Sequence, residues 1–144
     1  MATIKSFTDI QQSHKLAEIL PIESADMWYD NNGESIAGKP EVRYCSFVGL
    51  ASINVPCWSL AALLSILPSE FTEKGKYSET TYKIDIRKYA LTDDVDLYQI
   101  AYGNYKFYED GNHSWNDMVN TGEKENLLDA AFEMICWLGK NNKL

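Results

Sequence analysis

The chain has 144 residues, of which 45% are hydrophobic and 24% are charged, and this composition is that of an ordinary globular domain. Its formal net charge of −8 argues against nonspecific binding to nucleic acid or to an anionic membrane, because both need a basic surface. The three scattered cysteines do not form a disulfide framework, and the chain contains neither a signal peptide nor an apolar run long enough to cross a membrane. We therefore expect a single cytoplasmic domain over residues 1–144.

The first elements along the chain are a helix and a strand. The helix is predicted to begin near Thr8 or Asp9, where the hydroxyl groups of Ser6 and Thr8 can accept the first free N–H groups, and to end at Pro21. Residues 25–29 are predicted to be extended, and the segment Asp30–Gly33 is a strong turn signal, because Asn and Gly tolerate a positive φ. Most of the next stretch is polar and is predicted to be a loop.

The clearest element of the first half is a helix over 56–67. Pro56 suits the first helical position, where its missing N–H is not needed, and Pro68 ends the element. Because the residues between them are apolar nearly all round, we predict that this helix is buried at the centre of the fold. A strand near 42–50 is predicted before it.

The second half is predicted to contain an antiparallel meander. Polar and apolar residues alternate over 77–88, as in a half-buried strand. Two further strands, 97–102 and 105–109, are predicted on either side of a two-residue hairpin turn at Gly103–Asn104. The strands near 25–29 and 42–50 are candidates to extend this sheet.

A polar loop over 109–122 and a helix over 123–138, capped by Gly139, complete the chain. The apolar stripe of this helix is wider than one sheet face usually covers, so we expect it to pack on the sheet and on either the helix 56–67 or another chain. The predicted fold class is therefore α+β, with about three helices packed on a small antiparallel sheet.

One segment resembles a nucleotide-binding P-loop without satisfying its chemistry. The spacing of Gly33, Gly38 and Lys39 fits the motif, but Pro40 stands where a Ser or Thr hydroxyl would hold Mg²⁺ and a helix would begin. We interpret the segment as a solvated loop. Two histidines and no paired cysteines also make a zinc site improbable, so no cofactor and no metal are predicted.

Cys57 is the only cysteine for which a catalytic mechanism can be written. At the start of the helix 56–67 its thiolate would be favoured by the helix dipole, and His113 is one candidate for the base. Its apolar neighbours favour a thiol packed in the core instead. We therefore predict no catalytic residue and keep Cys57 with His113 as the alternative.

The strongest candidate binding surface is aromatic. The predicted hairpin carries Tyr98, Tyr102, Tyr105 and Tyr108, and Trp137 lies at the edge of the apolar stripe of the last helix. Such rings either cover helices and pair across strands, or form an exposed patch that anchors a partner. We keep both interpretations at this stage.

Three strings of the chain resemble a known family. They are Ser24–Asp26, the string Val55–Leu64 with its continuation to Pro68, and Asp129–Leu138. They are similar to a family of small uncharacterised proteins, a domain of unknown function, found in gut Bacteroidales and in their phages and mobile elements. The resemblance implies a cytoplasmic setting and a phage or mobile-element context, and it implies no activity.

The function expected from these observations is that of a noncatalytic protein-binding or regulatory module. Self-association through the last helix or the hairpin is one form of it, and neither nucleic acid nor membrane is an expected partner. The alternative is a small enzyme or ligand-binding protein with a cleft near Cys57, His113 or the loop 109–122.

Overall fold

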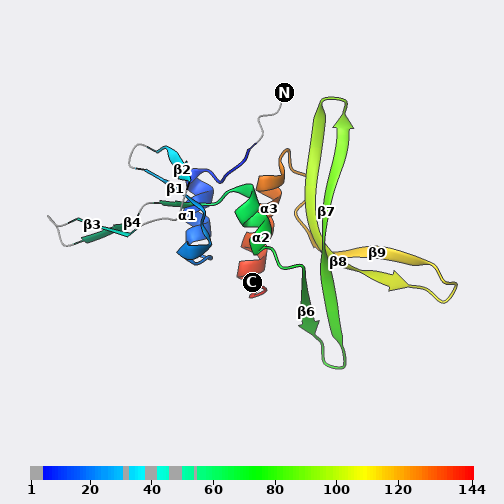
Figure 1. The fold of residues 1–144 in the computed structure, drawn as a ribbon. Coiled ribbons are helices and arrows are strands. Elements are labelled where there is room, and N and C mark those ends of the chain that lie inside the picture. Colours follow the sequence, from blue (N-terminus) through cyan, green and yellow to red (C-terminus); the bar gives the residue numbers. More distant parts are fainter. Residues whose placement is uncertain (1–4, 31–32, 38–41, 46–49, 54) are drawn as a thin grey trace. The chain divides into compact units, whose positions relative to one another are not determined.

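The computed structural model describes residues 5–30, 33–37, 42–45, 50–53 and 55–144, and it confirms the predicted α+β class (Figure 1). The described chain divides into two compact units, Lys5–Ile66 and Leu67–Leu144. The predicted single domain over 1–144 stays a prediction. Lys39 and Pro40, on which the P-loop interpretation turns, lie outside the described residues.

Short elements make up the unit Lys5–Ile66. They are α1 (Ile10–Ala17), a 3₁₀ turn (Ile22–Ser24), β1 (Met27–Tyr29), β2 (Ser35–Ala37), β3 (Val42–Cys45), β4 (Leu50–Ile53), β5 (Val55–Cys57) and α2 (Leu60–Ile66). The strands form an antiparallel sheet of order β2–β1–β5 and a separate antiparallel pair, β3–β4. The expectation that strands near 25–29 and 42–50 extend the meander is therefore wrong, because both regions pair within their own half of the chain.

The first helix begins close to its predicted start, with a different cap. Asp9 is the N-cap of α1, its carboxylate accepts the backbone N–H of Gln12 at 2.8 Å, and the Gln12 side chain accepts the Asp9 N–H in return. This is a capping box, which satisfies two otherwise free N–H groups. Thr8, whose hydroxyl was predicted to cap the helix, is instead fully buried.

The predicted central helix 56–67 is corrected in two respects. Pro56 and Cys57 belong to β5 and pair with β1, because an extended backbone here completes a three-stranded sheet. α2 therefore begins only at Leu60, after Ser59, whose hydroxyl accepts the backbone N–H of Ala62 at 3.1 Å. The helix is also not buried all round: of its residues only Leu63 is fully buried, because small residues occupy its outward positions.

The unit Leu67–Leu144 is an antiparallel sheet with one helix. Its elements are β6 (Glu70–Lys74), β7 (Glu79–Thr92), β8 (Val95–Phe107), β9 (His113–Asn120) and α3 (Leu127–Lys140), and the strand order is β6–β7–β8–β9. The predicted antiparallel pairing of 77–88 with 97–102 is confirmed in β7 and β8, but the expected loop 109–122 contains the edge strand β9, and a further edge strand, β6, precedes β7. The sheet also divides, because β6 pairs with the start of β7 and β9 pairs with the end of β8 (Figure 1).

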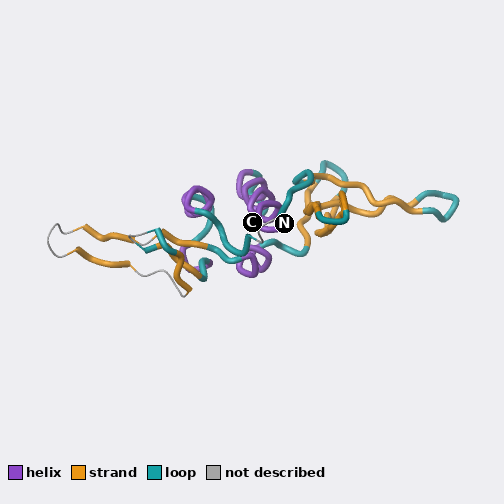
Figure 2. The backbone as a smooth tube through the Cα atoms, turned by 90° about the horizontal axis from the view of Figure 1, so that it is seen from above, coloured by secondary structure: helices purple, strands orange, loops and turns teal. Residues whose placement is uncertain are grey.

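The hairpin turn predicted at Gly103–Asn104 is wrong. β8 continues through both residues to Phe107, and the ladder with β9 carries a bulge between Tyr102 and Gly103. The turn lies instead at residues 108–112, where the β8–β9 ribbon ends, well beyond the rest of the sheet (Figure 2). Gly103 lies inside the strand because the Trp115 ring packs against its backbone.

The last helix packs on the sheet as predicted, with shifted ends. Asn126 caps its N-terminus by accepting the Asp129 N–H at 2.9 Å, and Gly139 lies inside the helix, which continues to Lys140. Its buried residues are Leu128, Ala130, Ala131, Met134, Ile135 and Leu138. Together with Ile100 and Tyr102 of β8, which are also fully buried, they form the core of this unit.

Candidate functional site

The sheet of the second unit has one face toward α3 and one face away from it. Phe71 and Tyr102 lie on the face toward α3, because the Phe71 ring contacts both Tyr102 of β8 and Trp137 of α3, with centroids 5.1 Å and 6.2 Å away. The residues next to Tyr102 in the strand, and every second residue from them, therefore point to the opposite face, which we call the outer face. Across β7, β8 and β9 it carries Asp85, Arg87, Tyr89, Gln99, Gly103, Tyr105, Phe107, His113, Trp115 and Asp117.

An ion pair joins two strands on this face. The guanidinium of Arg87 on β7 donates to both carboxylate oxygens of Asp117 on β9, at 2.9 Å and 2.5 Å. It also donates to Asp85 at 2.7 Å and to Gln99 at 3.1 Å. Hydrogen bonds from Arg87 lower the pKa of Asp117 below the usual range of a carboxyl group. The same hydrogen bonds raise the pKa of Arg87 above the usual value of a guanidinium. The bidentate geometry fixes β9 against the centre of the sheet.

This ion pair predicts acid sensitivity. Because folding lowers the pKa of Asp117, the pair stabilises the fold fully above about pH 5 and loses that effect as the pH falls through the usual carboxylate range. We expect Arg87→Met to lower the free energy of unfolding by about 1–2 kcal/mol at pH 7 and by less at pH 3. Urea unfolding at the two pH values measures both.

Lys88→Met is the matched control, since it removes the exposed ion pair of Lys88 with Asp96 on the same strand. It should change stability by a few tenths of a kcal/mol, about what an exposed pair contributes. An Arg87→Met variant that loses as much stability at pH 3 as at pH 7 would show that the charge on Asp117 is not involved.

The same carboxylate orients a tryptophan. The indole N–H of Trp115 donates to Asp117 at 2.7 Å, so the ring is held on the outer face. Gly103 pairs with Asp117 across the ribbon, and a Cβ at Gly103 would stand 2.9 Å from two atoms of the Trp115 ring and would overlap the carbonyl oxygen of Asn116. Glycine is therefore required inside this strand because an indole lies against its backbone.

Three more rings extend from Trp115 toward the end of the ribbon. Tyr105 meets Trp115 edge to face, with centroids 5.2 Å apart and planes at 82°, and meets His113 in the same way at 5.4 Å. Phe107 lies beside His113 at 5.9 Å. We call Tyr105, Phe107, His113 and Trp115 the aromatic cluster. Its rings are in contact with one another and still face solvent, since Tyr105 is 55% exposed and Phe107 is 78% exposed.

The five aromatic residues predicted to bind a partner are divided between the two faces of the sheet. Tyr105 and Tyr108 are on the exposed end of the ribbon, where the Tyr108 hydroxyl is 3.1 Å from that of Ser114. Tyr102 is fully buried, donates its hydroxyl to the carbonyl of Pro68 at 2.6 Å, and has a pKa raised by burial. Trp137 contacts Phe71, and Tyr98 alternates onto the same side.

Sequence reasoning missed the residues that hold the cluster in place. Arg87, Trp115 and Asp117 were assigned to a plain strand and to a loop, although the order Asp110–Gly111–Asn112 between two aromatic segments is a hairpin signal. Gly111 does adopt a positive φ of 84° in that turn. Recognising this turn would have placed Trp115 across from Tyr105.

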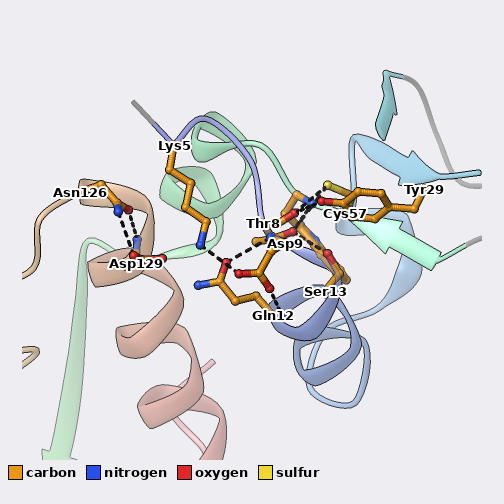
Figure 3. Close-up of polar contacts among 10 residues, drawn as sticks. Lys5, Thr8, Asp9, Gln12, Ser13, Tyr29, Cys57, Asn126 and Asp129 are labelled. Atoms are coloured by element: carbon orange, nitrogen blue, oxygen red, sulfur yellow. Dashed lines mark hydrogen bonds and ion pairs between the residues drawn. The ribbon is translucent and has the colours of Figure 1, made fainter. Parts of the chain in front are cut away.

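Cys57 belongs to a buried polar network in the other unit (Figure 3). It is fully buried, its thiol lies 3.4 Å from the carbonyl oxygen of Thr8, and the Thr8 hydroxyl is 2.7 Å from that of Ser13. The Tyr29 hydroxyl donates to the same Thr8 carbonyl at 2.5 Å. Burial raises the pKa of Cys57, and it raises the pKa of Tyr29 to about 12. The expected packed thiol is confirmed, and this environment suppresses the thiolate that a nucleophile needs.

We accordingly expect Cys57 to resist alkylation. In the native protein at pH 7.4, iodoacetamide should modify Cys57 at least about 100-fold more slowly than in the urea-unfolded chain, because reaction requires opening of the core. Tandem mass spectrometry of the digested protein locates the modified cysteine. Equal rates in the two states would restore Cys57 as a candidate nucleophile.

Each unit also has an open hollow on its surface. The one in the second unit, of about 310 Å³, lies where the sheet divides and is lined by Tyr82, Asn104, Tyr105, Lys106, Asn116, Asp117 and Met118. It adjoins the aromatic cluster through Tyr105. The other, of about 820 Å³, is lined by Phe7, Asp9, Ile10, Gln11, Tyr29, Gly33, Glu34 and Ser35.

The described part of the chain offers neither a metal-binding cluster nor a membrane-spanning helix. There, no three or more His, Cys, Asp or Glu side chains gather closely enough to hold a metal ion. Within the same residues, no helix has both the length and the apolar character needed to span a bilayer.

Comparison with known proteins found no match among family models, curated proteins or solved structures.

Proposed function

We propose that this chain is a noncatalytic protein-binding module whose contact surface is the aromatic cluster of the β8–β9 ribbon. The observation that carries the proposal is a connected group of four rings at the end of a sheet, in which Tyr105, Phe107 and His113 are exposed and Trp115 is half-buried. Exposed aromatic groups of this kind are the usual anchors of protein interfaces, because they bury a large area with few rotatable bonds.

The way in which the cluster is held supports the same proposal. Trp115 is fixed by Gly103 beneath it and by Asp117, which Arg87 holds in turn. Rings that are already ordered lose little conformational entropy when a partner binds. The alternative of an enzyme working through Cys57 has less support, since that thiol is fully buried. The cytoplasmic location and the phage or mobile-element origin stay part of the proposal.

A photo-crosslinking experiment tests this proposal. A benzoylphenylalanine placed at position 107 should, on irradiation in a lysate of the native host, give a discrete adduct with one protein. The matched control carries the same group at Tyr77, which is 88% exposed and lies in the turn between β6 and β7. An adduct at 107 and none at 77 supports the proposal, whereas equal labelling at both positions, or none at 107, overturns it.

A further inference from the structure

The aromatic cluster ends in an acidic turn. Residues 108–112 connect β8 to β9, and the backbone N–H groups of Tyr108 and Gly111 donate to Asn112 and to Tyr108 at 2.8 Å and 3.0 Å. The Asp110 carboxylate accepts both the backbone and the side-chain N–H of Asn112. These hydrogen bonds fix the turn, which directly follows the Phe107–His113 pair and carries the exposed acidic residues Glu109 and Asp110.

The charge around this turn is one-sided. Residues 67–144 carry 14 Asp and Glu against nine Lys and Arg. Two cations of β7 alternate onto the outer face, and neither lies at the turn: Arg87 is bound to Asp85 and Asp117, and Lys83 pairs with Gly103. Lys106 is the only Lys or Arg between residues 104 and 116 and alternates onto the other face of the ribbon.

Exposed rings beside carboxylates favour one kind of partner. A neutral apolar partner would bury Glu109 and Asp110 without compensation, and an anionic partner would be repelled. A cation with an apolar stem satisfies both features, because it can lie over a ring face and donate to a carboxylate. Arginine suits this better than lysine, since its planar guanidinium stacks on rings and pairs with carboxylates through two N–H groups.

We infer that the aromatic cluster, together with Glu109 and Asp110, binds an arginine-bearing cationic segment of a partner protein. This inference rests on the proposed function and specifies the chemistry of the partner. The rings provide the contact area and the carboxylates select the charge. The overall charge of −8 adds a long-range attraction for such a segment, which speeds association and weakens as salt is added.

The test uses the full chain and capped hexapeptides of alternating glycine with arginine, lysine or glutamate. Amide shifts in ¹⁵N spectra report where each peptide binds. The arginine peptide should shift residues 105–115 most, the lysine peptide should bind about threefold more weakly, and the glutamate peptide should not bind. The double variant Glu109→Gln/Asp110→Asn should weaken the arginine peptide about tenfold, and so should Phe107→Ala.

A charge-matched control separates site binding from general attraction. Asp93→Asn/Asp94→Asn makes the same change in net charge at the exposed turn between β7 and β8. Its affinity should stay within about twofold of the unaltered chain. Equal weakening by the two double variants, or shifts outside 105–115, overturns the inference. If no peptide binds while the crosslink at 107 captures a protein, the cationic partner is wrong and the binding function stands. A crosslinked second copy of the chain likewise overturns the inference.

Discussion

Gly103→Ala is expected to lower the free energy of unfolding by about 3 kcal/mol. The added Cβ would stand 2.9 Å from the Trp115 ring and would overlap the Asn116 carbonyl oxygen, and the backbone of a paired strand cannot move away as a flexible side chain can. The ladder between β8 and β9 must therefore shift, and the Trp115 N–H must leave Asp117. Urea unfolding followed by circular dichroism measures the loss of stability, and tryptophan fluorescence reports the displaced indole.

Gly111→Ala is the appropriate control, because Gly111 lies on the same ribbon and its substitution lowers stability through backbone conformation and not through steric overlap. A Cβ at Gly111 has no atom within 4 Å, but the residue has a φ of 84°, which costs alanine about 1 kcal/mol. We expect that variant to keep the fluorescence of the unaltered protein. If the two variants lose equal stability, steric contact with Trp115 is not what requires glycine at 103.

Gly103 also shows where a single sequence is ambiguous. Beside Asn104 it has the composition of a hairpin turn, and nothing within the segment opposes that interpretation. The deciding atoms belong to Trp115 and Asn116, more than ten residues away. Local patterns predict local structure, so the alternation over 77–88 and the wide stripe of the last helix led correctly to β7 and α3.

The region around Pro56 was misassigned for a related reason. Proline is as acceptable at an edge-strand position as at the start of a helix, and only the pairing of Trp28 with Pro56 decides between them. Residues 56–67 are mostly apolar, and this composition suits a buried strand followed by a helix as well as one continuous helix. Long-range pairing thus shortened the helix and turned its expected first turn into β5.

The candidate site was predicted in part. The aromatic residues of the predicted hairpin included Tyr105 and Tyr108, which the structure exposes, and Tyr102, which it buries. The groups that order the cluster were not identified, since Arg87 and Asp117 are 30 residues apart and become partners only through the register of three strands. A one-residue change of that register would place them on opposite faces.

Two of the three strings that resemble the family of small proteins from gut Bacteroidales contact each other in the structure. Asp26 accepts the backbone N–H of Ser59 at 2.8 Å and its hydroxyl at 2.5 Å, and the Ser24 hydroxyl accepts the indole N–H of Trp58 at 3.0 Å. Two of the three strings therefore have a structural explanation, since together they fix the start of α2. The membership itself stays a proposal.

Trp58→Ala is consequently expected to be the most damaging substitution in Lys5–Ile66, with a loss of about 4 kcal/mol. The side chain is fully buried, so its removal leaves a cavity the size of an indole. The Trp58 backbone also binds Thr8, through its N–H at 3.1 Å and its carbonyl at 2.9 Å, so the N-terminal segment would lose the surface against which it is held. Urea unfolding at pH 7 gives the free energy, and native-state hydrogen exchange shows whether protection at Thr8 is lost with it.

Trp58→Phe separates volume from hydrogen bonding. Phenylalanine refills most of the cavity and leaves only the Ser24 hydroxyl without its donor, so the loss should fall to about 1–2 kcal/mol. Ser24→Ala should cost about 1 kcal/mol by removing the acceptor alone. Tyr77→Ala, at an 88% exposed ring, should cost almost nothing. If Trp58→Phe proves as damaging as Trp58→Ala, then the indole N–H bond to Ser24, rather than packing, orders the start of α2.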